Sequence, residues 1–176
     1  MRRVSVIGST GSGKTTFGRA LAARLGVPFV ELDALNWEAD WTPAADEVFR
    51  RRAFHAAAGE SWVIDGNYSR LARDLVLARA DTVVWLDLPL RVTLWRILRR
   101  TLRRIRGGEE LWSGNRESVR KAFLSRDSLL LFALRTHRGR RERVTRRLAL
   151  PEYAHLRVHR FGSAVEAERW LAGFGL

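Results

Sequence analysis

The chain contains no cysteine among its 176 residues. This absence excludes disulfide bonds, thiolate metal sites and a catalytic thiol. No apolar run reaches the ~18–20 residues that a membrane-spanning helix needs, and no signal-peptide segment follows Met1. We therefore expect a cytoplasmic protein without a membrane partner.

Lysine is also scarce, since only Lys14 and Lys121 occur beside 30 arginines. A lysine in so arginine-rich a chain suggests a specific chemical need. Acidic residues are rare between Arg96 and Arg147, where 16 arginines and one lysine face five acids and give a net charge of +12. Such a local excess predicts a polyanionic partner, either nucleotide phosphates or a nucleic acid backbone.

The pattern of elements indicates an α/β protein. An apolar content of 46% suffices for a core, and we expect one domain over residues 1–176. Short apolar strands alternate with helices, which favours a parallel sheet covered on both faces. The expected strands are 4–7, 29–32, 62–64, 82–86 and 156–161. The expected helices are 14–25, 43–58, 69–78, 90–106, 117–138 (continuing into the arginines up to 147) and 163–172. Thr42 is expected to cap the second helix, with Pro43 in its first turn.

Residues 8–15 match G-x-x-x-x-G-K-[ST] between a predicted strand and a predicted helix. Small residues let backbone N–H groups surround a phosphate, and the helix N-terminus adds its positive end. Lys14 is expected to reach the terminal phosphates of ATP, and the Thr15 hydroxyl to bind Mg²⁺. The expected nucleotide-binding residues are Gly8, Ser9, Thr10, Gly11, Ser12, Gly13, Lys14, Thr15 and Thr16. We call residues 8–15 the phosphate loop.

Three predicted strands end at an aspartate, namely Asp33, Asp65 and Asp87. One such acid beside the loop strand commonly orders Mg²⁺, and Asp65 is favoured because an irregular loop follows it. Asp87 precedes Pro89 and a helix, so it is interpreted as an N-cap. Asp33 is expected to bind an acceptor or accept its proton, because ligands bind at the carboxyl ends of parallel strands.

Arginines recur at helical spacing after Asp87 and form one cationic face, made of Arg96, Arg99, Arg100, Arg103 and Arg104. A glycine-containing polar loop over residues 107–115 then joins two helices. This arrangement predicts a short lid over about residues 96–140, which would bring arginines to the transferring phosphoryl group. The alternative is a solvated basic face.

Seven tryptophans are many for this length. We expect packing roles for Trp62, Trp85, Trp95 and Trp170. Three aromatic residues fall in loops after the second and third strands and are candidates for stacking on a substrate: Trp37, Trp41 and Tyr68. The four histidines show no metal-ligand spacing.

The order of these motifs resembles the adenylate kinase-like nucleotide kinases, in which an Asp-x-Pro such as Asp87-Leu88-Pro89 is followed by two phosphate-binding arginines. This resemblance implicates Arg96 and Arg100. A closer resemblance is to adenylate kinase-related proteins, also called DNA topology modulation proteins. It rests on residues 32–37 (LDALNW), residues 63–69 (VIDGNYS) and the arginine-rich helix. It implies a P-loop three-layer sandwich with five parallel strands in the order 2-3-1-4-5, which places the Asp65 strand beside the loop strand.

The chain departs from true adenylate kinases, which have Asp-Gly-Phe-Pro-Arg where this sequence has Asp65-Gly66-Asn67-Tyr68-Ser69. Their AMP-binding motif after the second strand is absent as well. Kinases for shikimate or gluconate, like this chain, keep an aspartate at the end of that strand. The acceptor is therefore left open.

The sequence thus predicts a phosphotransferase that moves the γ-phosphate of Mg·ATP to a nucleotide, a nucleoside or a small hydroxyl metabolite. The expected catalytic residues are Lys14, Asp33, Arg96 and Arg100. Thr15 and Asp65 are expected at the metal, and Asp33, Trp37, Asn67 and Tyr68 at the substrate. The alternative is a nucleotide-dependent nucleic-acid-binding protein that affects DNA topology, which is less favoured because no nucleic-acid-reading motif occurs.

Overall fold

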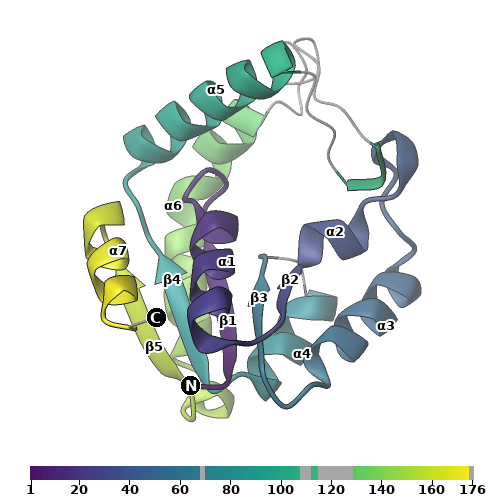
Figure 1. Ribbon diagram of the computed structural model, residues 1–176, viewed down its shortest axis with the longest axis vertical. Helices are drawn as coiled ribbons and strands as arrows, with labels where there is room; N and C mark the ends of the chain where they lie inside the picture. Colours follow the sequence, from purple (N-terminus) through teal and green to yellow (C-terminus); the bar gives the residue numbers. More distant parts are fainter. Residues whose placement is uncertain (68–69, 108–111, 115–128, 175–176) are drawn as a thin grey trace.

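The computed structural model describes residues 1–67, 70–107, 112–114 and 129–174. Its centre is a sheet of five parallel strands in the order β2-β3-β1-β4-β5 (Figure 1). This order confirms the one implied by the resemblance. The inner strands are apolar and buried along most of their length, as expected where helices cover both faces of a parallel sheet. The strands are β1 (Arg3–Gly8), β2 (Phe29–Glu31), β3 (Trp62–Asp65), β4 (Thr82–Leu86) and β5 (Arg157–Phe161).

Helices cover the two faces of this sheet and build two cores. On one face α1 and α7 pack through Leu21 and Leu171. On the other face α3 and α4 pack through Phe49 and Val76, and the end of α6 joins them through Leu148. The described helices are α1 (Lys14–Leu25), α2 (Leu32–Asn36), α3 (Asp46–Ala57), α4 (Arg70–Arg79), α5 (Leu90–Gly107), α6 (Leu129–Leu148) and α7 (Ala164–Ala172). Short 3-10 turns are η1 (Ala39–Trp41), η2 (Trp112–Gly114) and η4 (Pro151–Tyr153).

The region after β2 differs from the expectation. Asp33 lies in the short helix α2, two residues beyond the end of β2, and not at the end of the strand. The next helix begins at Asp46 after Ala45, without a side-chain cap, so the predicted start at Thr42 and Pro43 is wrong. The reason is that Pro43 forms a bridge with Trp37 and the backbone N–H of Ala44 donates to Asn36, which keeps this stretch extended.

The burial of the tryptophans and the bounds of α6 agree only in part with the expectations. Trp62 and Trp85 are buried, and Trp170 stacks on Phe17, so these packing predictions are confirmed. Trp95 is 62% exposed on α5, so its predicted core position is wrong. The arginines from 138 to 147 are helical within α6, as expected, whereas part of the helix predicted over 117–138 lies outside the described residues.

Within the described ranges, no helix combines the length and the apolar character needed to cross a membrane. The cytoplasmic location stays a prediction.

Candidate functional site

The carboxyl ends of β1, β3 and β4 meet at one edge of the sheet. Because these strands are parallel neighbours, Val6 pairs with Asp65, and Gly8 pairs with Leu86. The phosphate loop leaves β1 at this edge and enters α1. Gly11 in the loop has a φ of 79°, and a Cβ atom there would lie 2.6 Å from the Thr93 carbonyl oxygen of α5. Only glycine meets both conditions, so α5 packs directly against the loop backbone.

Lys14 extends back along the loop, where its Nζ donates a hydrogen bond to the Ser9 carbonyl at 3.3 Å. Burial of the charged end lowers the pKa of Lys14, and the negative charges of Asp65 and Asp33 partly oppose this effect. Repulsion by Arg140 and Arg100 adds to the lowering. The loop thus contains a desolvated cation surrounded by further cations, an environment that a bound polyanion would stabilise.

The hydroxyl of Thr15 donates a 2.5 Å hydrogen bond to Oδ2 of Asp65. Asp65 is 4% exposed, and its Oδ1 is buried without a hydrogen-bond partner among the described residues. Burial raises the pKa of Asp65, while the charge of Lys14 and the hydrogen bond from Thr15 lower it. A buried carboxylate oxygen that lacks a donor fits a hard cation such as Mg²⁺ or its bound water. No group of three or more metal-binding side chains occurs in the described part of the chain, so such an ion would depend on phosphate oxygens as well.

Asn67 follows β3 and holds the start of the loop. Its Oδ1 accepts from the Gly8 N–H at 3.1 Å, and its Nδ2 donates to the Gly8 carbonyl at 2.5 Å. This structural use of the amide was not apparent in the sequence, and a substrate contact by Asn67 stays a prediction. Tyr68, the other substrate candidate in this loop, lies outside the described residues.

Of the two predicted lid arginines, Arg96 contacts the phosphate loop directly. Its Nη1 donates to the Ser12 carbonyl at 3.0 Å. The hydroxyl oxygen of Ser12 is itself buried and has no hydrogen-bond partner within the described structure. Arg100, one turn later on α5, is close enough to act on the pKa of Lys14. The structure therefore places Arg96 at the loop and Arg100 one turn further along the same helix, while their roles in catalysis stay predictions.

The predicted acceptor residues Asp33 and Trp37 lie in and just after α2. The charge of Asp33 acts on the pKa of both Lys14 and Asp65, so the carboxylate belongs to the same electrostatic group. The rings of Trp37 and Trp41 meet edge to face, with centroids 5.7 Å apart. The Ser113 hydroxyl of η2 donates to the Trp37 carbonyl at 2.8 Å, which brings the segment after α5 to the acceptor side.

Helix α6 contributes residues that the sequence did not single out. Arg140 Nη1 donates to the Gly8 carbonyl at 3.3 Å, and His137 Nδ1 lies 3.5 Å from the Ser9 hydroxyl. Asp87 was expected to cap the following helix. Its described bonds go to Arg141 and Arg160 and not to the start of α5, so that interpretation is corrected. Nothing in the sequence marked Arg140 among 30 arginines, because only the packing of α6 selects it.

The sequence is similar to that of shikimate kinases over part of its length. A model of the shikimate kinase family matches residues 10–60, which include most of the phosphate loop and Asp33. The chain is 40% identical over 99 residues to a shikimate kinase of Symbiobacterium thermophilum, covering 48% of this chain and 56% of that protein. It is 28% identical over 152 residues to a shikimate kinase of Persephonella marina, covering 73% and 84%. The first two curated relatives are matched over 56% and 63% of their own length.

Solved structures show the same fold. The shikimate kinase of Aquifex aeolicus matches with a TM-score of 0.57 and 17% identity, over 97% of this chain and 92% of that one. A gluconokinase of Sinorhizobium meliloti matches with a TM-score of 0.54 and 20% identity, over 98% and 91%. The chain therefore has the P-loop kinase fold, compatible with the broader adenylate kinase-like group. These matches do not support the DNA topology modulation group or a nucleic acid partner.

Proposed function

We propose that this chain is an ATP-dependent phosphotransferase that transfers the γ-phosphoryl group of Mg·ATP to a hydroxyl group of a small metabolite. The observation that carries this proposal is the phosphate loop with a buried Lys14 ammonium beside the Thr15–Asp65 hydrogen bond. One side of this arrangement suits an anion and the other a cation, as a metal-bound triphosphate requires.

The donor side of the reaction is assigned to the loop and the arginines around it. Loop N–H groups and Lys14 hold the terminal phosphates, since their charge is best compensated by fixed dipoles and a buried cation. Arg96, fixed on the Ser12 carbonyl, and Arg100 stabilise the charge that develops during transfer. Both arginines lie on α5, which packs on the loop at Gly11.

Thr15 and Asp65 are assigned to Mg²⁺. The buried Asp65 Oδ1 lacks a donor within the described structure and is the atom that suits a cation or a cation-bound water. A bound Mg²⁺ would supply charge neutralisation between the phosphate groups. The protein residues orient the Thr15 hydroxyl and keep the carboxylate in place.

Asp33 is assigned to the acceptor, where it orients a hydroxyl group and receives its proton. Its position after β2 supports this role, because it shares an electrostatic environment with Lys14 and Asp65. The matched family region covers Asp33 as well as most of the phosphate loop. Shikimate is therefore the first acceptor to test, and Trp37 is the nearby aromatic candidate for contact with it.

The test is ADP release, measured in a coupled assay with Mg·ATP and a panel of shikimate, other hydroxy acids, polyols, nucleosides and nucleotides. We expect turnover stimulated by one hydroxyl acceptor, and its loss in a Lys14→Ala variant. Absence of stimulation by every acceptor, together with equal Mg·ATP binding by wild type and variant in calorimetry, would contradict the proposal.

A further inference from the structure

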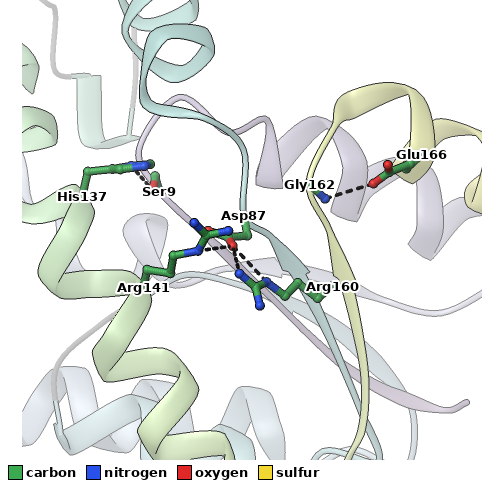
Figure 2. Close-up of polar contacts among 7 residues, drawn as sticks. All are labelled: Ser9, Asp87, His137, Arg141, Arg160, Gly162 and Glu166. Atoms are coloured by element: carbon green, nitrogen blue, oxygen red, sulfur yellow. Dashed lines mark hydrogen bonds and ion pairs between the residues drawn. The ribbon is translucent and has the colours of Figure 1, made fainter.

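One turn of helix α6 contacts the phosphate loop. His137 lies against Ser9, and Arg140 donates to the Gly8 carbonyl (the His137–Ser9 contact is drawn in Figure 2). These contacts are three residues apart on the helix, close to one full turn, so a small rotation of α6 would break both. The position of this turn therefore determines how the beginning of the loop is supported.

Electrostatics opposes this contact. Burial lowers the pKa of Arg140, and the arginines around it, Arg143 and Arg73, lower it further. Arg140 in turn acts to lower the pKa of Lys14, which shows that the two cations repel. A cationic helix that approaches a lysine-containing loop needs a negative group to hold it there.

Asp87 is a negative group that contacts α6 at Arg141, the residue after Arg140. Its Oδ2 accepts from Arg141 Nε at 2.8 Å and from Arg160 Nε at 2.9 Å, and the side chain is only 8% exposed (Figure 2). The backbone is fixed as well, because the Asp87 N–H donates to the Phe161 carbonyl at 2.9 Å. Asp87 thus connects α6 to the ends of β4 and β5.

We propose that Asp87 is a positioning residue of the nucleotide site, which acts by holding Arg141 and so fixes the turn of α6 that supports the phosphate loop. Only the expected effect on nucleotide binding rests on the proposed function. The mechanical part, support of the loop by α6, stands on the contacts of Asp87, Arg141 and Arg140 alone.

A competing role for Asp87 is to anchor only β5 through Arg160, whose guanidinium also lies 4.5 Å from the centre of the Trp85 ring. Single replacements separate the two roles. Arg141→Met removes the α6 partner and leaves Arg160 in place, whereas Arg160→Met does the reverse. In either variant the buried Asp87 carboxylate keeps the other arginine as its partner, so neither replacement leaves it unpaired.

The chain offers a matched control for Asp87→Asn. Asp74 of α4 binds Arg147 near the other end of α6 and also accepts from the Tyr153 hydroxyl at 3.2 Å. Asp74→Asn therefore releases the same helix from a carboxylate, but away from the phosphate loop. General loosening of α6 would appear in both variants, and loss of loop support only in Asp87→Asn.

The experiment measures amide hydrogen exchange of residues 8–14 in the nucleotide-free protein, together with Mg·ATP affinity and the melting temperature. We expect Asp87→Asn and Arg141→Met each to speed amide exchange of the loop about tenfold and to weaken Mg·ATP binding about tenfold. In Asp74→Asn and Arg160→Met, both quantities should stay within about twofold of the wild-type values. Unchanged loop exchange in folded Asp87→Asn, or an equal effect of Asp74→Asn, overturns the proposal.

The proposal can be tested even if one variant does not fold or the protein binds no Mg·ATP. If Asp87→Asn does not fold, Arg141→Met removes the same ion pair from the exposed side and is read by the same exchange measurement. If the wild-type protein binds no Mg·ATP, the proposed function fails, but the exchange comparison still decides whether Asp87 supports the loop.

Discussion

Replacement of Asp65 by asparagine is the perturbation that most directly tests the metal assignment. The substitution keeps the size of the side chain and an oxygen that can accept from the Thr15 hydroxyl, now 2.5 Å from Oδ2. It removes a negative charge that is 4% exposed and acts on Lys14. The variant therefore changes charge with little change in packing.

The expected effect of Asp65→Asn on ATP affinity differs with and without the metal. Residues that hold or orient a metal ligand typically contribute about 10–100-fold to metal affinity, which corresponds to about 1.4–2.8 kcal/mol. We expect Asp65→Asn to weaken Mg·ATP binding by this factor. Binding of ATP in excess EDTA should stay equal or become tighter, because a carboxylate that repels the triphosphate is gone.

The assay is isothermal titration of ATP into wild type and variant, once with Mg²⁺ and once with EDTA. Asp81→Asn is the control, since Asp81 is another carboxylate bound to protein donors, namely the N–H groups of Arg2 and Arg3. It lies at the opposite edge of the sheet, just before β4. Equal weakening of ATP binding in both media by Asp65→Asn would refute the metal assignment and leave Asp65 a structural residue.

Three further predictions concern other parts of the site and the fold. Asp33→Asn should lower acceptor-stimulated turnover by about 10²–10⁴-fold with little change in Mg·ATP affinity, and an equal loss of affinity would argue against an acceptor role. Gly11→Ala should destabilise the protein by about 1–3 kcal/mol in denaturant titration, because the new Cβ would meet the Thr93 carbonyl. Gly26→Ala controls for backbone strain alone, because Gly26 also has a positive φ but a Cβ there would have no atom within 4 Å. Burial by itself raises the pKa of Asp81, but hydrogen bonds from Thr82 and from the backbone of Arg3 and Arg2 outweigh it and lower the pKa. The resulting stabilisation is present above pH 3.8 and is lost as the pH falls through the lower pKa that Asp81 has in the folded protein. The melting temperature of Asp81→Asn should therefore fall less steeply at acid pH than that of the wild type. An equally steep fall would contradict the stabilising role of Asp81.

The donor half of the site could be predicted because its information is local. The phosphate loop is a contiguous motif, and its strand-loop-helix context follows from the apolar run before it and the helical pattern after it. Asp65 could be placed beside Thr15 because the strand order implied by the resemblance puts its strand next to β1, and parallel strands end at the same edge of a sheet. Here the predicted neighbours are joined by a hydrogen bond.

The rest depended on packing that a single sequence does not encode locally. The arginines of α6 are alike in sequence, and only the angle at which the helix lies on the sheet selects Arg140 for the loop and Arg141 for Asp87. Trp95 was misplaced for a related reason. Trp95 and Ile97 are both apolar residues of α5 but lie on different sides of the helix, and it is Ile97 that faces the loop at Gly11.

The phosphate loop is held from three sides by the protein itself. Asn67 and Arg140 bind the Gly8 carbonyl, Arg96 binds the Ser12 carbonyl, and α5 packs against Gly11. A loop braced in this way has little conformational freedom left to lose when a nucleotide arrives. Its affinity for phosphate can then come almost entirely from charge and fixed dipoles, as expected of a preorganised receptor.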